Sequence, residues 1–327
     1  MKKPVALGMA VAAILGAIVS GANAQPSKSA YPARPVRVVV GYAAGGATDI
    51  VGRLIAQKLS EATGQSFTVE NRPGASATIA AEMVARAVPD GYTLFIAASA
   101  SHSIMPSLMS KLSYNPQRDF APVSLVALSP QLLVVHPSLP VRSVADMIKV
   151  ARARPGQLNF GSGGLGTPPH LAGEMFSQMA GVNLLHVPYK GEAPAITDLI
   201  GGQLSLIFSN VVAVLQQVQA GRLRGIAVTA ASRLPTLPQY PAISESLPGY
   251  ATDSWFGLVS AAGTPAEVIA RLNADTVRGL AQKDVRDKLA VQGLFVQSST
   301  PAELSARMHS EFVRWAKVIK TAGIRIE

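Results

Sequence analysis

The chain has 327 residues, a formal net charge of +10 at neutral pH and no cysteine. The missing cysteines exclude a disulfide framework and thiol chemistry, and a chain of this length can bury two hydrophobic cores. Nucleic-acid binders cluster basic residues on one face and interleave aromatic residues. Here aromatic residues make up only 6% and the basic residues are scattered. We therefore expect no nucleic-acid partner, and we interpret the charge as a solvated surface whose field attracts anions.

The first 24 residues are organised like a secretory signal peptide. Lys2 and Lys3 form a basic start, residues 5–19 are apolar and uncharged, and residues 22–24 (Ala-Asn-Ala) fit a small-x-small cleavage site. We predict cleavage after Ala24 and export of the mature chain to the periplasm. An uncleaved N-terminal anchor is the alternative. No later stretch is apolar for long enough to span a bilayer.

Strand and helix patterns alternate along the mature chain, which predicts an α/β fold with mostly parallel sheets. Helices are expected between most of the strands, and apolar stripes at helical spacing end the chain. In chain order, we expect strands or extended segments at 35–42, 67–71, 93–99, 120–137, 155–160, 184–189, 204–210, 223–229 and 254–265.

Two extended passages, around 120–130 and 254–265, connect two such α/β units. We assign residues 25–124 and 254–327 to a discontinuous first lobe and residues 125–253 to a second lobe. The arrangement predicts a two-lobed, type II-like periplasmic binding protein fold, with two mostly parallel sheets flanked by helices. A ligand cleft lies between the lobes, with hinges near Ser124 and Gly257. A single large doubly wound sheet is the alternative.

Each predicted lobe has a glycine-rich loop between a strand and a helix, "GYAAGGATD" at 41–49 and "GSGGLGT" at 161–167. Open α/β sheets bind ligands at this end of their strands. Exposed N–H groups and a helix N-terminus favour an anion there. The second loop also spells G-x-G-x-x-G, but the acidic residue expected about twenty positions later is missing. We therefore expect no nucleotide and no other cofactor.

Neither loop carries arginine or lysine, so recognition should use neutral donors rather than an arginine clamp. Thr167 is expected to cap the helix that begins at Pro168. Asp49 pins its loop or contacts the ligand, and His170 bonds the helix start or the ligand. The expected ligand-binding residues are Tyr42, Ala44, Gly45, Gly46, Thr48, Asp49, Ser101, Ser162, Gly163, Gly166, Thr167, His170, Tyr189 and Asn210.

The sequence offers little support for catalysis or for a metal site. Ser101 and His102 are adjacent, but neighbouring residues on an extended chain point apart, and no G-x-S-x-G elbow is present. We interpret "ASASHS", residues 98–103, as a loop that lines the cleft. The five histidines lack H-E-x-x-H spacing, so we expect no metal.

The sequence also resembles the Bug-type periplasmic solute-binding receptors of tripartite tricarboxylate transporters. The resemblance covers essentially the whole mature chain and includes "GGATDIVGR", "VENRPGASATIAAEMVA", "PDGYTL", "SHSIMPSLM", "RDFAPVSLVA", "HPSLPV", "ARPGQLNFGSGG", "GTPPHLAGEMF", "HVPYKG", "AGRLRGIAVT" and "SWFGLVSAAGTP". It implies the two-lobed fold and a carboxylate-bearing solute held between the glycine loops through N–H groups and waters. It also implies a large and a small permease subunit as membrane partners.

Two positions depart from the family pattern. Family members often carry proline near the start of the first loop, where this chain has residues 41–44 (Gly-Tyr-Ala-Ala), and an acidic residue where Ser209 stands. The second departure favours a simple carboxylate over a zwitterionic amino acid.

Three functions follow from these observations. The first is a monomeric receptor that closes on a small organic carboxylate and delivers it to membrane permease subunits. The second is a ligand sensor that signals through a membrane histidine kinase without transport. The third, an exported hydrolase, lacks an organised set of nucleophile, base and metal. The sequence favours the first, a binding protein that is not an enzyme.

Overall fold

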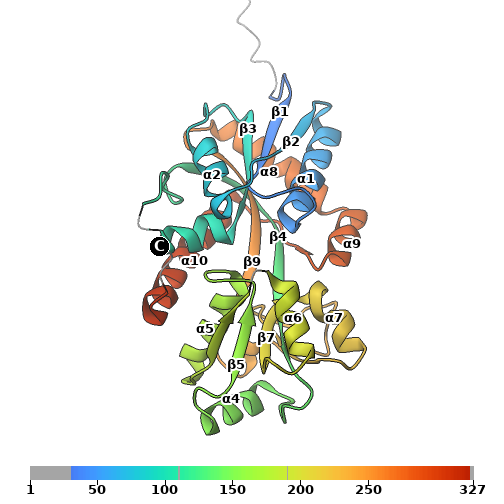
Figure 1. Ribbon diagram of the computed structural model, residues 1–327. Coiled ribbons are helices and arrows are strands. Elements are labelled where there is room, and N and C mark those ends of the chain that lie inside the picture. The colour runs from blue at the N-terminus through green and yellow to red at the C-terminus, as the bar shows by residue number, and fades with distance from the viewer. Residues whose placement is uncertain (1–30, 110, 190, 325–327) are drawn as a thin grey trace, which may run out of the picture.

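Two lobes lie one above the other, and long strands pass between them (Figure 1). The computed structural model describes residues 31–109, 111–189 and 191–324. The predicted signal peptide and its cleavage after Ala24 lie outside these residues. Within them, strands and helices alternate over most of the chain, as the sequence predicts.

The sheet of the upper lobe in Figure 1 contains, in spatial order, β2 (Phe67–Asn71), β1 (Val36–Val40), β3 (Thr93–Ala98), β9 (Asp253–Ala261) and β4 (Phe120–Val135). The short strand β10 (Phe295–Val296) pairs with the other edge of β4. β1, β2 and β3 are parallel, whereas β9 is antiparallel to β3 and β4. The run of valines in β1 is typical of a strand that is covered on both faces.

Helices cover both faces of the upper sheet. Val38 and Val40 contribute to a core shared with α1, α8 and α9, and Val39 contributes to a core shared with α2 and the first half of α10. This alternation follows from the period of two in a strand. The helical segments of this part are α1 (Ala47–Thr63), η1 (Ala75–Ala77), α2 (Thr78–Ala85), η2 (Ala100–Ile104), α3 (Met105–Leu108), α8 (Ala266–Leu280), α9 (Lys283–Val291) and α10 (Pro301–Ala322).

The lower lobe has its own sheet, which uses the second half of β4. Its spatial order is β6 (Leu185–Pro188), β5 (Asn159–Ser162), β7 (Leu206–Asn210) and β4, with β8 (Arg224–Val228) on the other edge of β4. The helical segments are α4 (Val144–Ala153), α5 (Pro168–Ala180), α6 (Glu192–Ile200), α7 (Val211–Gln219) and η3 (Ile243–Glu245).

The strand directions bring the two glycine loops to facing ends of the lobes. Because β3 and β4 are both antiparallel to β9, they run the same way, and the parallel strands β1 and β2 also run toward the lower lobe. β7 is antiparallel to β4 and parallel to β5, and β5 is parallel to β6. These three strands therefore run toward the upper lobe. The carboxyl ends of both sets, where the loops follow, meet at the junction between the lobes.

The junction itself is crossed by β4 and β9. β4 pairs with β9 as far as Pro130, opposite Asp253, and pairs with β7 from Gln131 onward. β3 ends at the level of Ala127 and β7 at the level of Gln131. The two sets of strand ends are thus separated by four residues of β4, or about 13 Å along the strand. We propose the lobe boundary after Pro130, a few residues beyond the sequence-based boundary after residue 124.

Helix α10 extends across the same junction. Leu304 and Met308 near its start are buried in the core of the upper lobe, and Trp315 and Ile319 are buried with residues of α5, β5 and β7. Gln178 of α5 also donates a hydrogen bond to the carbonyl oxygen of Val318 at 3.0 Å. The second half of α10, which the sequence-based assignment gives to the first lobe, therefore packs on the lower lobe.

Candidate functional site

The first glycine loop leaves the start of helix α1 open. Gly46 stands at the N-cap position with φ −81° and ψ 170°, and no side chain caps the helix. The N–H groups of a helix's first turn have no partner within the helix, and those of Gly46, Ala47 and Thr48 have none among the described residues. A Cβ atom on Gly46 would make only an ordinary van der Waals contact, 3.9 Å from the Ala43 carbonyl oxygen. This loop can therefore present several N–H groups to an anion.

Asp49 holds this loop in place. Its Oδ2 accepts hydrogen bonds from the Gly45 N–H and from Arg53 Nε, both at 2.9 Å, and its Oδ1 accepts from Asn71 Nδ2 at 2.8 Å. Burial alone raises the pKa of Asp49, but these hydrogen bonds and the charge of Arg53 outweigh burial and lower it. Of the two roles left open by the sequence, the structure uses Asp49 to pin the loop. The contribution of Asn71, in "VENRPG", was not predicted.

Two further predicted residues belong to this loop: Tyr42 packs against the upper-lobe cores, whereas Thr48 has a hydroxyl without a partner among the described residues. The carbonyl oxygen of Tyr42 accepts a hydrogen bond from Asn71, and its half-buried ring packs beside both cores of the upper lobe. Burial raises the pKa of its hydroxyl to about 12. Thr48 is only 6% exposed, yet its hydroxyl has no hydrogen-bond partner among the described residues. Thr48 can therefore offer a hydroxyl beside the free N–H groups.

The second glycine loop is largely closed by its own hydrogen bonds. The Gly164 N–H donates to Ser162 Oγ at 3.1 Å, and the Gly166 N–H donates to His170 Nδ1 at 3.0 Å. The Thr167 hydroxyl donates to the carbonyl oxygen of Gly164 at 2.7 Å. Gly164 and Gly166 have positive φ angles, 136° and 70°, which favour glycine.

The prediction that the Thr167 side chain caps α5 is wrong. Thr167 is at the N-cap position, but its hydroxyl turns back into the loop and accepts no capping hydrogen bond. Pro168 and Pro169 have no N–H group to offer, so the His170 N–H is the one donor at the usual capping positions, and the Thr167 hydroxyl bonds Gly164 instead of accepting from it. The N–H groups of Gly163 and His170 have no partner among the described residues, so both are free to donate.

Two stacked histidines hold the second glycine loop in place through hydrogen bonds. The rings of His170 and His186 lie 3.8 Å apart between centroids and are nearly parallel, at 17°. His186 Nε2 lies 2.7 Å from Ser162 Oγ, and Phe160 contacts both rings. Burial, with a smaller contribution from His170, lowers the pKa of His186 to about 4. Because its Nδ1 accepts from Gly166, His170 acts as a structural support of the loop.

The predicted cleft-lining loop at residues 98–103 is instead mostly a buried helical turn. η2 follows β3 closely, and Ser101, His102 and Ser103 are fully buried. Ser101 Oγ lies 2.9 Å from His102 Nδ1, so the expectation that these neighbours point apart is wrong. A helical turn rather than an extended chain brings them together. Burial lowers the pKa of His102 to about 3, and neither side chain reaches solvent.

The remaining predicted residues lie at the ends of β6 and β7. The Tyr189 hydroxyl donates to Asp198 Oδ2 at 2.6 Å. Asn210 donates to Glu192 through both its N–H and its side-chain amide at 2.9 Å, and its Oδ1 accepts from Ser129 of β4 at 3.1 Å. These contacts tie the end of β7 to α6 and to the crossing strand.

Glu192 was not among the predicted site residues. It begins α6 and also accepts a hydrogen bond from Ser209 Oγ at 2.6 Å. An acidic side chain at position 209 would therefore lie against Glu192 and repel it. The signal in the sequence was an acidic residue in the first turn of a helix, directly after Gly191.

Comparison with known proteins identifies the family. The family described as "Tripartite tricarboxylate transporter family receptor" matches residues 51–324. The chain belongs to this receptor family. BugT of Bordetella pertussis (strain Tohama I) is 33% identical over 319 residues, which cover 96% of this chain and 98% of BugT. The predicted resemblance to Bug-type receptors is thus confirmed, and the family consists of receptors that bind solutes rather than enzymes.

Solved structures of similar proteins confirm the predicted fold. "R. palustris Rpa4515 with adipate" is 42% identical, covers 90% of this chain and 99% of its own, and superimposes with a TM-score of 0.74. "MatC (Rpa3494) from Rhodopseudomonas palustris with bound malate" is 33% identical, covers 88% and 100%, and has a TM-score of 0.70. In the part of this receptor that the structure describes, no helix combines the length and the apolar character needed to cross a membrane.

Proposed function

We propose that this receptor captures a small carboxylate-bearing organic anion between its two glycine loops. It acts in the periplasm as a monomer and delivers the solute to the permease subunits of a tripartite tricarboxylate transporter. The observation that carries the proposal is the convergence of strand ends at the junction, with an uncapped helix start in the first loop.

Electrostatics favour an anion at this place. The N-terminus of a helix carries a partial positive charge and free N–H groups, which together form an anion site. α1 is 17 residues long, and neither glycine loop contains a charged residue other than Asp49. Because Asp49 already accepts three hydrogen bonds, its charge is directed into the loop rather than toward the junction. A carboxylate is then bound by neutral donors, each hydrogen bond being charge-assisted on the ligand side.

The two loops contribute unequally in this proposal. The first loop offers the free N–H groups of residues 46–48 and the Thr48 hydroxyl, whereas the second offers mainly Gly163 and His170. We assign the carboxylate to the first loop and the rest of the solute to the second. The proteins solved with adipate and with malate support this chemical class.

The test is calorimetry with adipate, malate and their diamides, combined with small-angle scattering. At least one acid should bind, its diamide should not, and the radius of gyration should fall as the lobes close on the ligand. A diamide that binds as tightly as its acid would refute the carboxylate assignment. Binding without any compaction would refute the closure of the lobes. Delivery to the permease is tested in a separate uptake experiment. Cells that lack the permease subunits should lose uptake of the same acid.

A further inference from the structure

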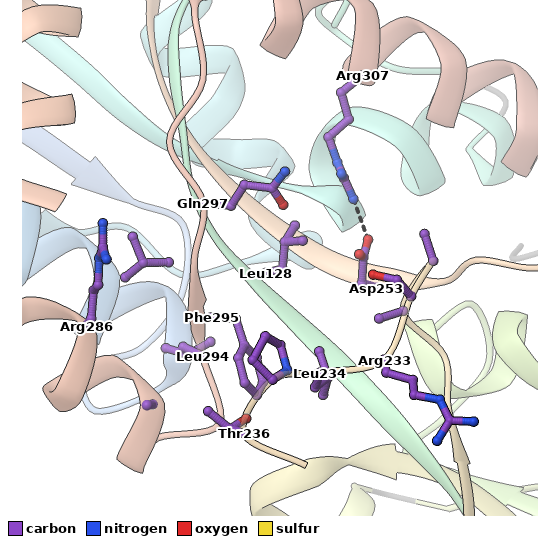
Figure 2. Close-up of a pocket in the computed structure, with 16 residues that line it drawn as sticks. Leu128, Arg233, Leu234, Thr236, Asp253, Arg286, Leu294, Phe295, Gln297 and Arg307 are labelled. Atoms are coloured by element: carbon purple, nitrogen blue, oxygen red, sulfur yellow. Dashed lines mark hydrogen bonds and ion pairs between the residues drawn. The ribbon is translucent and has the colours of Figure 1, made fainter. Parts of the chain in front are cut away.

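A cavity of about 530 Å³ lies beside the crossing strands (Figure 2). Its walls come from β4 and β9, from the loop after β8 in the lower lobe, and from α9, β10 and α10 of the upper lobe. No residue of either glycine loop lines it. The cavity is therefore distinct from the proposed solute site, although it spans the same junction.

The interior of the cavity is mainly apolar. Leu128 of β4, Leu234 of the lower lobe, and Leu294 and Phe295 of the upper lobe line it (Figure 2). Leu234 and Leu294 are buried, and Phe295 is half-buried. Pockets for small organic molecules are usually about 300–1,000 Å³ and mostly apolar with a few polar groups. In size and lining, this cavity is suited to the hydrocarbon part of a small molecule.

Among the described residues, the charged side chains that line the cavity include one arginine without an ion-pair partner. Arg233 forms two hydrogen bonds with Glu245, at 2.9 and 2.8 Å. Arg307 pairs with Asp253, as the dashed line in Figure 2 shows. Arg286 of α9 also lines the cavity and forms no ion pair with any described residue. The lining is thus complementary to an apolar molecule that carries a single negative charge.

We infer that this cavity is a second binding site, for a small amphiphilic monoanion whose apolar body lies among Leu128, Leu234 and Phe295 and whose anionic group pairs with Arg286. Because both lobes and both crossing strands form the walls, the fit of such a molecule depends on the angle between the lobes. A ligand that prefers one arrangement shifts the population toward it. The occupant therefore regulates opening and closing of the receptor.

The test uses 1-anilinonaphthalene-8-sulfonate, an aromatic molecule with one sulfonate that fluoresces in apolar sites. It is titrated into the full mature protein in the absence of any carboxylate, so the result does not depend on the proposed function. Ala290→Trp places a large ring in the cavity from an exposed position of α9. Val291→Trp is the matched control, because Val291 is 73% exposed on the same helix and does not line the cavity.

We expect saturable binding that Ala290→Trp weakens about tenfold or more, which corresponds to about 1.4 kcal/mol, and that Val291→Trp leaves unchanged. Arg286→Gln should weaken binding several-fold, whereas Arg222→Gln, at an exposed position outside the cavity, should not. Circular dichroism verifies that each variant is folded. Equal affinities of Ala290→Trp and Val291→Trp would overturn the site, and an unaffected Arg286→Gln would overturn the role of that charge.

A separate measurement tests whether binding in the cavity changes the arrangement of the two lobes. Small-angle scattering of the wild type should show a different radius of gyration with and without the probe, and Ala290→Trp should abolish that difference. An identical scattering profile at saturating probe would overturn the regulatory part of the inference.

Discussion

The Gly46→Val variant tests whether the first glycine loop binds an anion or only connects a strand to a helix. The backbone at Gly46 is extended, at φ −81° and ψ 170°, so valine can adopt it without strain. Its Cβ meets nothing closer than 3.9 Å. The protein should therefore fold normally, while the valine methyl groups occupy space in front of the N–H groups that the carboxylate needs.

The size of the effect follows from the number of hydrogen bonds lost. A hydrogen bond to a charged group contributes about 1.5–3 kcal/mol. If the valine prevents two of the N–H groups of residues 46–48 from reaching the carboxylate, binding weakens by about 3–6 kcal/mol. That loss raises the dissociation constant about 10²- to 10⁴-fold.

Calorimetry with adipate or malate, whichever binds the wild type, measures this loss. Gly201→Val is the control, because Gly201 has a negative φ of −76° at the end of α6 and a Cβ there makes ordinary contacts, the nearest at 3.5 Å. This control should bind the acid like the wild type. If Gly46→Val also binds the acid normally while circular dichroism shows both variants folded, the first loop does not hold the carboxylate.

Three further predictions concern the loops themselves. Gly163→Ala should lower the melting temperature as well as the affinity, because its Cβ would lie 3.3 Å from the backbone of Gly191, tighter than most real contacts. Thr167→Ala should reduce stability by about 1 kcal/mol, measured by urea unfolding, through loss of one hydrogen bond to Gly164 rather than loss of a helix cap. Asp49 has a lowered pKa in the folded state, so it stabilises the protein above its unfolded pKa of about 3.9, and this contribution is lost as the pH falls through the folded value. The stability difference between the wild type and Asp49→Asn should therefore shrink below about pH 4, and a constant difference would contradict this role.

The sequence by itself determined the order of strands and helices and the positions of both glycine loops. These features depend on neighbours along the chain. The valines of β1 indicate a strand covered on both faces, and an acidic residue four positions after Gly45 can bond its N–H within one helical turn. The family motifs likewise lie in short contiguous stretches, and the fold they predicted is the one observed.

The partners of individual side chains were decided only by the tertiary structure. Ser162 and His186 are 24 residues apart, and the pairing of β5 with β6 brings them to 2.7 Å, which closes the second loop. The segment that the sequence predicts to be a cleft-lining loop is the buried helical turn η2. Tyr114, which is 13 residues further along the chain, donates a hydrogen bond from its hydroxyl to the Ser101 carbonyl oxygen of this turn.

The cavity beside the crossing strands gives the clearest case. Leu128, Arg286 and Arg307 belong to distant parts of the chain, and no local pattern connects them. Periodicity acts over a few residues, so it can be recognised in a sequence. A cavity, a closed loop and a helix that packs on both lobes depend instead on strand register and lobe docking, which bring together residues that are far apart along the chain.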